Sequence, residues 1–92
     1  MIGFALIEFR IYNTHSLKDK RSVIKRILTR TKQRFNISIA EVKHQDLWQR
    51  TEIAIATVAS TRHKAEHELQ HAIEFLDSFP EWERIGIAYE WL

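Results

Sequence analysis

The sequence predicts an α+β fold of the ferredoxin-like βαββαβ class, in which two helices cover one face of a four-stranded antiparallel sheet. Its 92 residues leave room for a single hydrophobic core. Apolar side chains alternate with the period of a strand in four segments, and they recur with the period of a helix in two segments between them. The order of these segments is that of the split βαβ motif. We therefore expect one domain over residues 1–92.

The four predicted strands cover residues 2–12, 37–43, 50–59 and 82–92. In the last of them, Ile85, Ile87, Tyr89 and Trp91 are expected on one face because side chains alternate along a strand. Right-handed crossovers place the first and third strands in the middle of the sheet. With both helices on one face, the opposite face of the sheet stays open.

The two predicted helices cover residues 17–35 and about 61–78. Ser16 and Asp19 resemble a capping box at the start of the first helix, with Asp in place of the usual Glu or Gln. Asn36 is the expected C-terminal cap. Ser60 or Thr61 is the expected N-cap of the second helix.

Composition excludes several kinds of protein. The chain has no cysteine, which excludes disulfides and thiol catalysis. The apolar N-terminal run contains Glu8 and Arg10 and has no basic leader, so we expect neither a signal peptide nor a membrane span. We therefore expect a soluble cytoplasmic protein without a membrane partner. Because no Gly-rich phosphate loop, HExxH or Gly-x-Ser-x-Gly motif occurs, we expect no enzymatic activity, cofactor or small-molecule substrate.

Two groups of titratable residues bear on that expectation. Glu41, His44 and Asp46 lie close in sequence. The alternative hypothesis is that they form the acid–base cluster of an enzyme, which needs a cleft that excludes water. Three histidines recur at four-residue spacing in the second predicted helix: His63, His67 and His71. Such spacing allows zinc binding, but these side chains face away from the apolar stripe. A solvated row without a metal is therefore the expectation.

The first predicted helix concentrates the positive charge of the chain. Residues 16–35 carry eight basic and one acidic side chain, a net charge of +7, whereas the whole chain carries +2. Like charges four residues apart destabilise a helix by ~0.2–0.5 kcal/mol per pair, so stability alone does not favour this arrangement. The predicted nucleic-acid-binding face consists of Lys18, Arg21, Lys25, Arg26, Arg30 and Lys32. Lys20 and Arg34 lie nearer the buried edge, where long side chains extend their charges to solvent.

An anionic partner is the first interpretation of this face, and RNA is favoured over a membrane because the apolar stripe is needed for the core. The aromatic run that RNA-recognition motifs place on their third strand is absent, which favours contacts to the phosphates of structured RNA. A solubilising face is the second interpretation. A further hypothesis is a protein-interaction or homodimer module that uses the open sheet, because exposed apolar surface indicates interaction sites.

Four segments carry a family resemblance: Ser16–Arg21, Arg34–Val42, His44–Arg50 and Tyr89–Leu92. With these segments the chain resembles the YlxP-like family of small bacterial proteins, over essentially its whole length. The resemblance implies a ferredoxin-like fold and no known activity. Genes of this family tend to neighbour those for transcription, translation-initiation and ribosome-maturation factors, which implies an RNA or ribosomal context.

The resemblance assigns two motifs of the family to positions in this chain, but it assigns no catalytic residue. The family's basic helix-start motif maps to Lys18, Lys20 and Arg21, and its hairpin motif to Asp46, Trp48 and Arg50, which we expect to bind a partner or shape the loop. Trp48 is interpreted first as a lid over one end of the sheet and second as a partner contact. Arg50 is expected to pair with Asp46 and hold the loop.

Overall fold

A computed structural model describes residues 1–92 and contains six regular elements in the order βαββαβ. Their bounds are β1 (Ile2–Ile11), α1 (Leu17–Arg34), β2 (Ser38–Lys43), β3 (Arg50–Val58), α2 (Arg62–Asp77) and β4 (Trp82–Trp91). The predicted ferredoxin-like α+β fold is therefore confirmed. Neither helix combines the length and the hydropathy that crossing a membrane requires.

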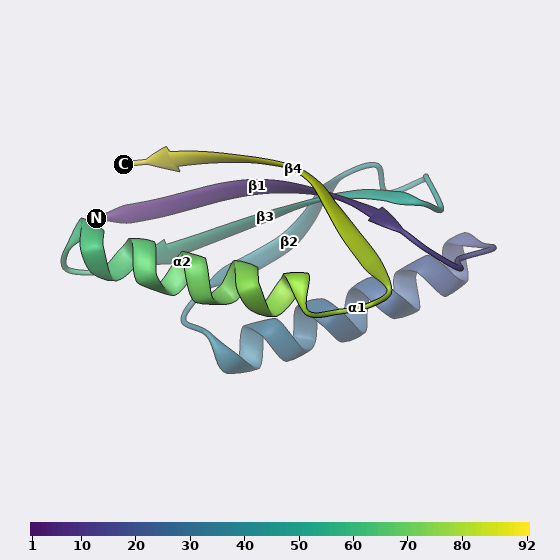
Figure 1. Cartoon of the computed structure of the whole chain (residues 1–92), viewed down its shortest axis with the longest axis horizontal. Coiled ribbons are helices and arrows are strands. Elements are labelled where there is room, and N and C mark those ends of the chain that lie inside the picture. Colours follow the sequence, from purple (N-terminus) through teal and green to yellow (C-terminus); the bar gives the residue numbers. More distant parts are fainter.

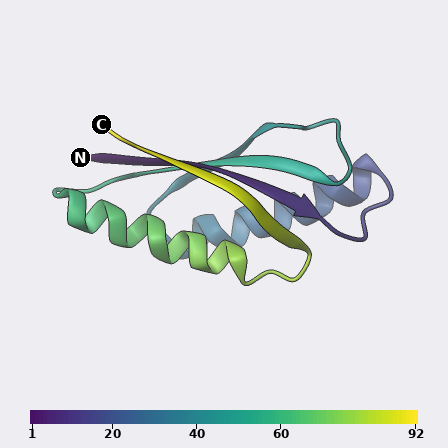
Figure 2. The same ribbon diagram turned by 45° about the horizontal axis from the view of Figure 1, so that its top comes forward.

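The four strands form one sheet in the order β2-β3-β1-β4, and every neighbouring pair is antiparallel. The expectation that the first and third strands lie in the middle is thus confirmed. Both helices cover the same face of this sheet (Figures 1 and 2). The two ends of the chain lie together at one end of the molecule (Figure 1), where the backbones of Ile2 and Leu92 exchange hydrogen bonds of 2.9 Å. The β2–β3 loop and the start of α1 lie at the other end.

The core lies between the sheet and the helices, and strand alternation supplies its floor. Ile7 and Phe9 of β1 and Ile55 of β3 are fully buried, and they meet Ile27 of α1 and Leu76 of α2. Burying one such side chain stabilises the fold by about 1.5–3 kcal/mol. Because the inner side chains of the central strands contact the helices, their outward neighbours form the open face.

Both helices have an N-cap residue that the sequence predicted, whereas α1 ends one residue earlier than predicted. Ser16 Oγ accepts a 3.0 Å hydrogen bond from the backbone N–H of Asp19, as a capping box requires, but Asp19 itself accepts from His15 rather than from Ser16. Thr61 caps α2 in the same manner. The predicted C-cap Asn36 is wrong, because Phe35 already has extended backbone angles.

Strand β4 contains an irregularity that the sequence pattern did not reveal. The register with β1 shifts between Glu8 and Phe9, which leaves Ile85 without a partner in a bulge. One extra residue reverses the alternation, so Trp82 and Arg84 lie on the helix side together with Ile87, Tyr89 and Trp91. Trp82, before the bulge, is instead buried, and its ring stacks on Phe9 with centroids 3.8 Å apart.

Candidate nucleic-acid interface

The basic side chains of α1 separate into two rows. The outer row consists of Lys18, Arg21, Lys25 and Lys32, which lie on the side of the helix away from its buried residues. All four are exposed, and none takes part in any ion pair of the structure. At a rise of 1.5 Å per residue the row extends over about 21 Å of helix.

The inner row runs along the flank that faces α2 and the start of β4. Arg26 forms an ion pair with Glu81, and its hydrogen bond holds the pKa of that carboxyl below its usual value. The guanidinium of Arg30 lies 5.3 Å from the centre of the Phe79 ring, a cation–π distance. Arg26 and Arg30 were both predicted to bind nucleic acid, but they already have partners within the fold.

Arg34 continues the inner row, and its guanidinium lies 5.0 Å from the ring centre of Phe75. It therefore stays near the protein surface and does not extend freely into solvent. The charge that is free to meet a partner is concentrated in the outer row, which is a narrower face than the sequence predicted.

Lys20 has a structural role, although it belongs to the basic helix-start motif of the family resemblance. Its side chain is 1% exposed, so the expectation that its charge reaches solvent is wrong. Lys20 Nζ lies 3.0 Å from a carboxylate oxygen of Glu41 on β2 and donates to the carbonyl of His44. Glu41 also accepts a 2.6 Å hydrogen bond from the hydroxyl of Thr51. These contacts connect α1 to β2 and to the hairpin loop.

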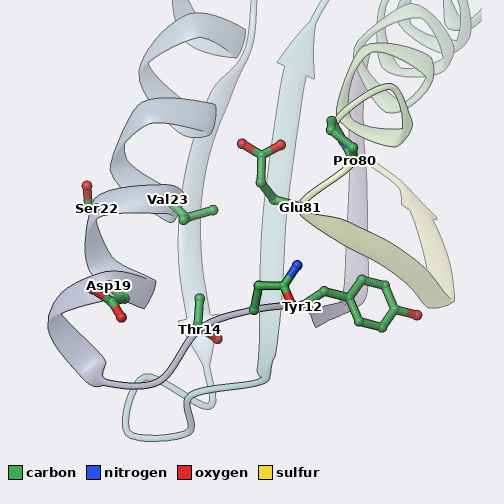
Figure 3. Close-up of a pocket in the computed structure, with 8 residues that line it drawn as sticks. Tyr12, Thr14, Asp19, Ser22, Val23, Pro80 and Glu81 are labelled. Carbon is green, nitrogen blue, oxygen red and sulfur yellow. The ribbon is translucent and has the colours of Figure 1, made fainter.

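A polar cleft of about 460 Å³ adjoins the start of α1 (Figure 3). Asp19 and Ser22 line its helix side, and Glu81 lines the opposite side. Tyr12 donates a 2.6 Å hydrogen bond to Glu83, and this carboxylate raises the pKa of the tyrosine hydroxyl. Because no basic residue lines it, the cleft does not extend the cationic surface.

The hairpin loop between β2 and β3 is arranged differently from the prediction. Arg50 forms its ion pair with Glu8 of β1 rather than with Asp46. The side chain of Trp48 is 49% exposed and lies outside the core, so the lid interpretation is wrong. The loop is held instead by its backbone, because the buried hydroxyl of Thr14 donates a 2.6 Å hydrogen bond to the carbonyl of Trp48. The role of the exposed ring as a partner contact stays a prediction.

The acid–base cluster considered from the sequence is not assembled. Glu41 is on the helix side of the sheet with Lys20, whereas His44 Nε2 lies 3.4 Å from Glu8, which belongs to the open face. The histidines of α2 are exposed, with ring centroids 4.7 Å apart for His63 and His67. No group of three or more potential ligands is positioned to hold a metal ion.

The open face of the sheet has an apolar half near the chain ends. One cross-strand row consists of Ala40, Ala54, Leu6 and Ala88, one residue from each strand. Beside it, Phe4 helps to line a shallow hollow of about 200 Å³. Toward the hairpin loop the same face becomes charged.

An aromatic pair on β4 was not singled out from the sequence. Tyr89 and Trp91 line a small cavity against α2, together with Leu69. The signal that was available is the spacing of two aromatic residues at i and i+2, which places both on one face of a strand. From the sequence, this spacing served only to place the two residues on one face of the strand.

Comparisons with known proteins agree with the fold and give no activity. A family model described as "Protein of unknown function (DUF503)" matches residues 2–89. The "Uncharacterized protein YlxP" of Bacillus subtilis (strain 168) is 55% identical over 91 residues, which cover 99% of each chain. The resemblance stated from the sequence is therefore confirmed. Among solved structures, the de novo designed protein Foldit4 is similar in fold, with a TM-score of 0.60 at 13% identity over 100% of this chain and 99% of that chain.

Proposed function

We propose that this chain, which belongs to the DUF503 family of proteins of unknown function, is a non-enzymatic module that binds structured RNA through the outer row of α1. RNA exposed on a ribosomal surface is included in this proposal, and a role in translation or ribosome maturation in the cytoplasm is the context we favour. The observation that carries the proposal is that Lys18, Arg21, Lys25 and Lys32 are exposed, aligned and unpaired.

Energetics support a partner for this row. Arg21 and Lys25 are four residues apart and repel each other, which destabilises the helix by ~0.2–0.5 kcal/mol. Acidic side chains elsewhere in the chain neutralise Arg26, Arg50 and Arg62, but none forms an ion pair with the outer row. A chain of phosphates supplies the missing negative charge and releases counterions when it binds.

The shape of the molecule favours a duplex over a single strand at this row. A straight helix presents charges at regular intervals and carries no exposed aromatic ring between them. The open face of β3 has no ring on which bases stack, because it consists of Arg50, Glu52, Ala54, Ala56 and Val58. Double-stranded RNA is recognised mainly through its shape and its phosphates, which matches what the outer row offers.

The test compares two variants that carry the same change of net charge. Lys18→Glu/Lys25→Glu reverses two charges of the outer row, whereas Lys43→Glu/Lys64→Glu reverses two exposed lysines outside α1. In fluorescence anisotropy with an RNA hairpin of about 16 base pairs, we expect the first variant to lose binding at least tenfold more than the second. Equal losses, or no binding by the wild type to the hairpin or to ribosomal subunits, would reject the proposal.

The same variants separate function from folding. Lys25→Glu replaces a repulsive pair with an attractive one, and Lys18→Glu places an acid in the first helical turn, where the helix dipole favours it. We therefore expect the outer-row variant to be at least as stable as the wild type in urea. Lost RNA binding in a protein of unchanged stability would assign the charges to recognition.

A second candidate function uses the open sheet. The apolar row around Leu6 and the hollow beside Phe4 are exposed surface that a second copy of the chain or another protein would cover. If this is the function, sedimentation velocity should show a dimer whose population rises with concentration, and Leu6→Glu should abolish it. A monomer at all concentrations would exclude the homodimer version.

A further inference from the structure

Tyr89 and Trp91 form an open pair of parallel rings. Their planes differ by 3° and their centroids are 6.5 Å apart. This separation is close to the repeat of alternate residues along a strand, about 6.6 Å, and it is the upper limit of the gap between the two ring planes. The rings line a cavity of about 220 Å³ between β4 and α2. This volume is smaller than the ~300 Å³ typical of a site for a drug-sized ligand, and it suits a single planar fragment.

One ring of the pair is fixed and the other is accessible. Trp91 packs so closely over Gly3 that a Cβ atom at this glycine would lie 2.6 Å from the indole. The guanidinium of Arg62 lies 4.9 Å from the Trp91 ring centre but does not line the cavity, whereas Trp91 itself does. Tyr89 is 53% exposed, so a ligand reaches it without unfolding.

The rim of the cavity has hydrogen-bonding groups. Gln70 has an exposed amide with a donor and an acceptor side by side, the combination that glutamine uses to contact adenine. Glu66 also lines the cavity, and its charge is balanced by Arg62, whose guanidinium lies 2.9 Å from the carboxylate. The charge at this rim is therefore close to neutral.

The geometry points to a binding site for one unpaired nucleobase, stacked on the aromatic surface that Tyr89 and Trp91 form in the cavity and contacted at its edge by Gln70. Bases splayed out of RNA are commonly held on aromatic side chains in this way. The base is supplied by a single-stranded region of RNA or by a free nucleotide, since the same ring chemistry serves both. The choice between these two sources rests on the proposed function, whereas the site itself is argued independently of it.

The position of the cavity makes the two proposals independent. The outer row lies on α1, which contacts β2, and the cavity lies on β4, at the opposite edge of the sheet. A flexible RNA strand beside a duplex could reach both. A variant in one surface leaves the side chains of the other unchanged, so each proposal can fail alone.

The test uses two probes, AMP and an eight-nucleotide oligoadenylate, with three proteins: wild type, Tyr89→Ala and Tyr89→Phe. Tyr89 is half exposed, so both variants should fold, and urea unfolding will check this. We expect Tyr89→Ala to weaken binding about 5- to 150-fold, the range measured when an aromatic ring that stacks on a base is removed. Tyr89→Phe keeps the ring and should bind like the wild type.

A spectroscopic measurement locates the ligand. In a Trp48→Phe background, the remaining tryptophans are Trp82, which is buried against Phe9, and Trp91. Quenching of fluorescence by the probe in this background would place the base at Trp91. Binding of the oligonucleotide alone would identify RNA as the source, and comparable binding of AMP would identify a free nucleotide.

The inference is overturned by three results: neither probe binds, Tyr89→Ala binds as well as the wild type, or binding leaves the fluorescence of Trp91 unchanged. The variant Lys18→Glu/Lys25→Glu serves as the comparison between the two proposals. It should lose the RNA hairpin but keep AMP binding within about twofold, because AMP binding depends on stacking rather than on the outer row.

Discussion

Lys20 is the basic residue of α1 that solvent does not reach, and its contacts explain why a cation occupies a buried position there. Its ammonium group meets the carboxylate of Glu41 and the carbonyl of His44. Burial of a charge is tolerated when the partner is fixed and hydrogen-bonded, and Thr51 supplies the second bond to Glu41. The side chain therefore joins a helix to a strand and a loop.

Replacing Lys20 should destabilise the fold strongly. Lys20→Ala leaves Glu41 without its counter-ion, and removing one partner of a buried pair typically costs about 3–5 kcal/mol. We expect about 3 kcal/mol here, since Glu41 keeps some solvent contact. Lys18→Ala, two residues earlier and exposed, should change stability by less than about 0.5 kcal/mol. Equal urea midpoints for the two variants would contradict this role.

Gly3 has a specific steric reason to lack a side chain. A Cβ atom there would lie 2.6 Å from Trp91 and 2.9 Å from Leu69, well inside van der Waals contact. Gly86 offers a natural comparison, because a Cβ atom at that position meets only Glu8, at 3.9 Å. The two glycines therefore differ in packing, although both lie in strands.

Gly3→Ala should accordingly cost about 1–3 kcal/mol through overpacking, whereas Gly86→Ala should be close to neutral. Urea denaturation of the two variants measures the difference. Because Trp91 must move to make room, Gly3→Ala should also weaken base binding at the β4 cavity. A Gly3→Ala protein as stable as Gly86→Ala would show that Trp91 does not pack as described.

At the scale of elements, α1 has separate sides for separate tasks. Its buried stripe packs on the sheet, its inner row contacts α2 and the start of β4, and its outer row contacts nothing in the fold. The ion pair between Arg26 and Glu81 is the contact of this helix that makes the stability of the protein depend on pH. The guanidinium keeps the pKa of Glu81 below its ordinary value of 4.5 in the folded state.

The sign of the pH effect follows from that shift. A carboxyl whose pKa is lowered by folding stabilises the protein above its unfolded pKa, and this contribution is lost as pH falls through the lower folded value. We therefore expect stability to decline below about pH 4.5, and Arg26→Gln to show a smaller decline than the wild type. Arg21→Gln, which loses no carboxylate partner, should keep the wild-type profile. Identical acid profiles for the two variants would contradict the role of the pair.

The elements themselves were largely predictable, and the exceptions have physical causes. Alternation and helical periodicity located all six elements because each buries one apolar face. The bulge at Ile85 was not predictable, because its position depends on how β4 pairs with β1. The division of the α1 charges into two rows was not predictable either. The sequence shows the charges, but it does not show that Glu81, Phe79 and Phe75 contact the inner row. The cavity beside Tyr89 was missed because it depends on the approach of α2.

At the scale of the whole molecule, charge is distributed unevenly over a chain of small net charge. Residues 16–35 carry a net +7 of a total of +2, so the rest of the chain is acidic. Such a distribution creates a directed field that attracts an anion to one side. The extents of the molecule, 42 × 22 × 16 Å, place the outer row along much of one side. A duplex lying against this side would meet all four cations.

The most direct test of this account is the salt dependence of RNA binding. If four cations each neutralise one phosphate, the logarithm of the binding constant should fall with the logarithm of salt concentration with a slope of about −3. Lys18→Gln/Lys25→Gln should reduce that slope to about −1.5, whereas Lys43→Gln/Lys64→Gln should leave it unchanged. A wild-type slope near zero, or a slope that the outer-row substitutions do not alter, would contradict the claim that α1 binds the phosphate backbone.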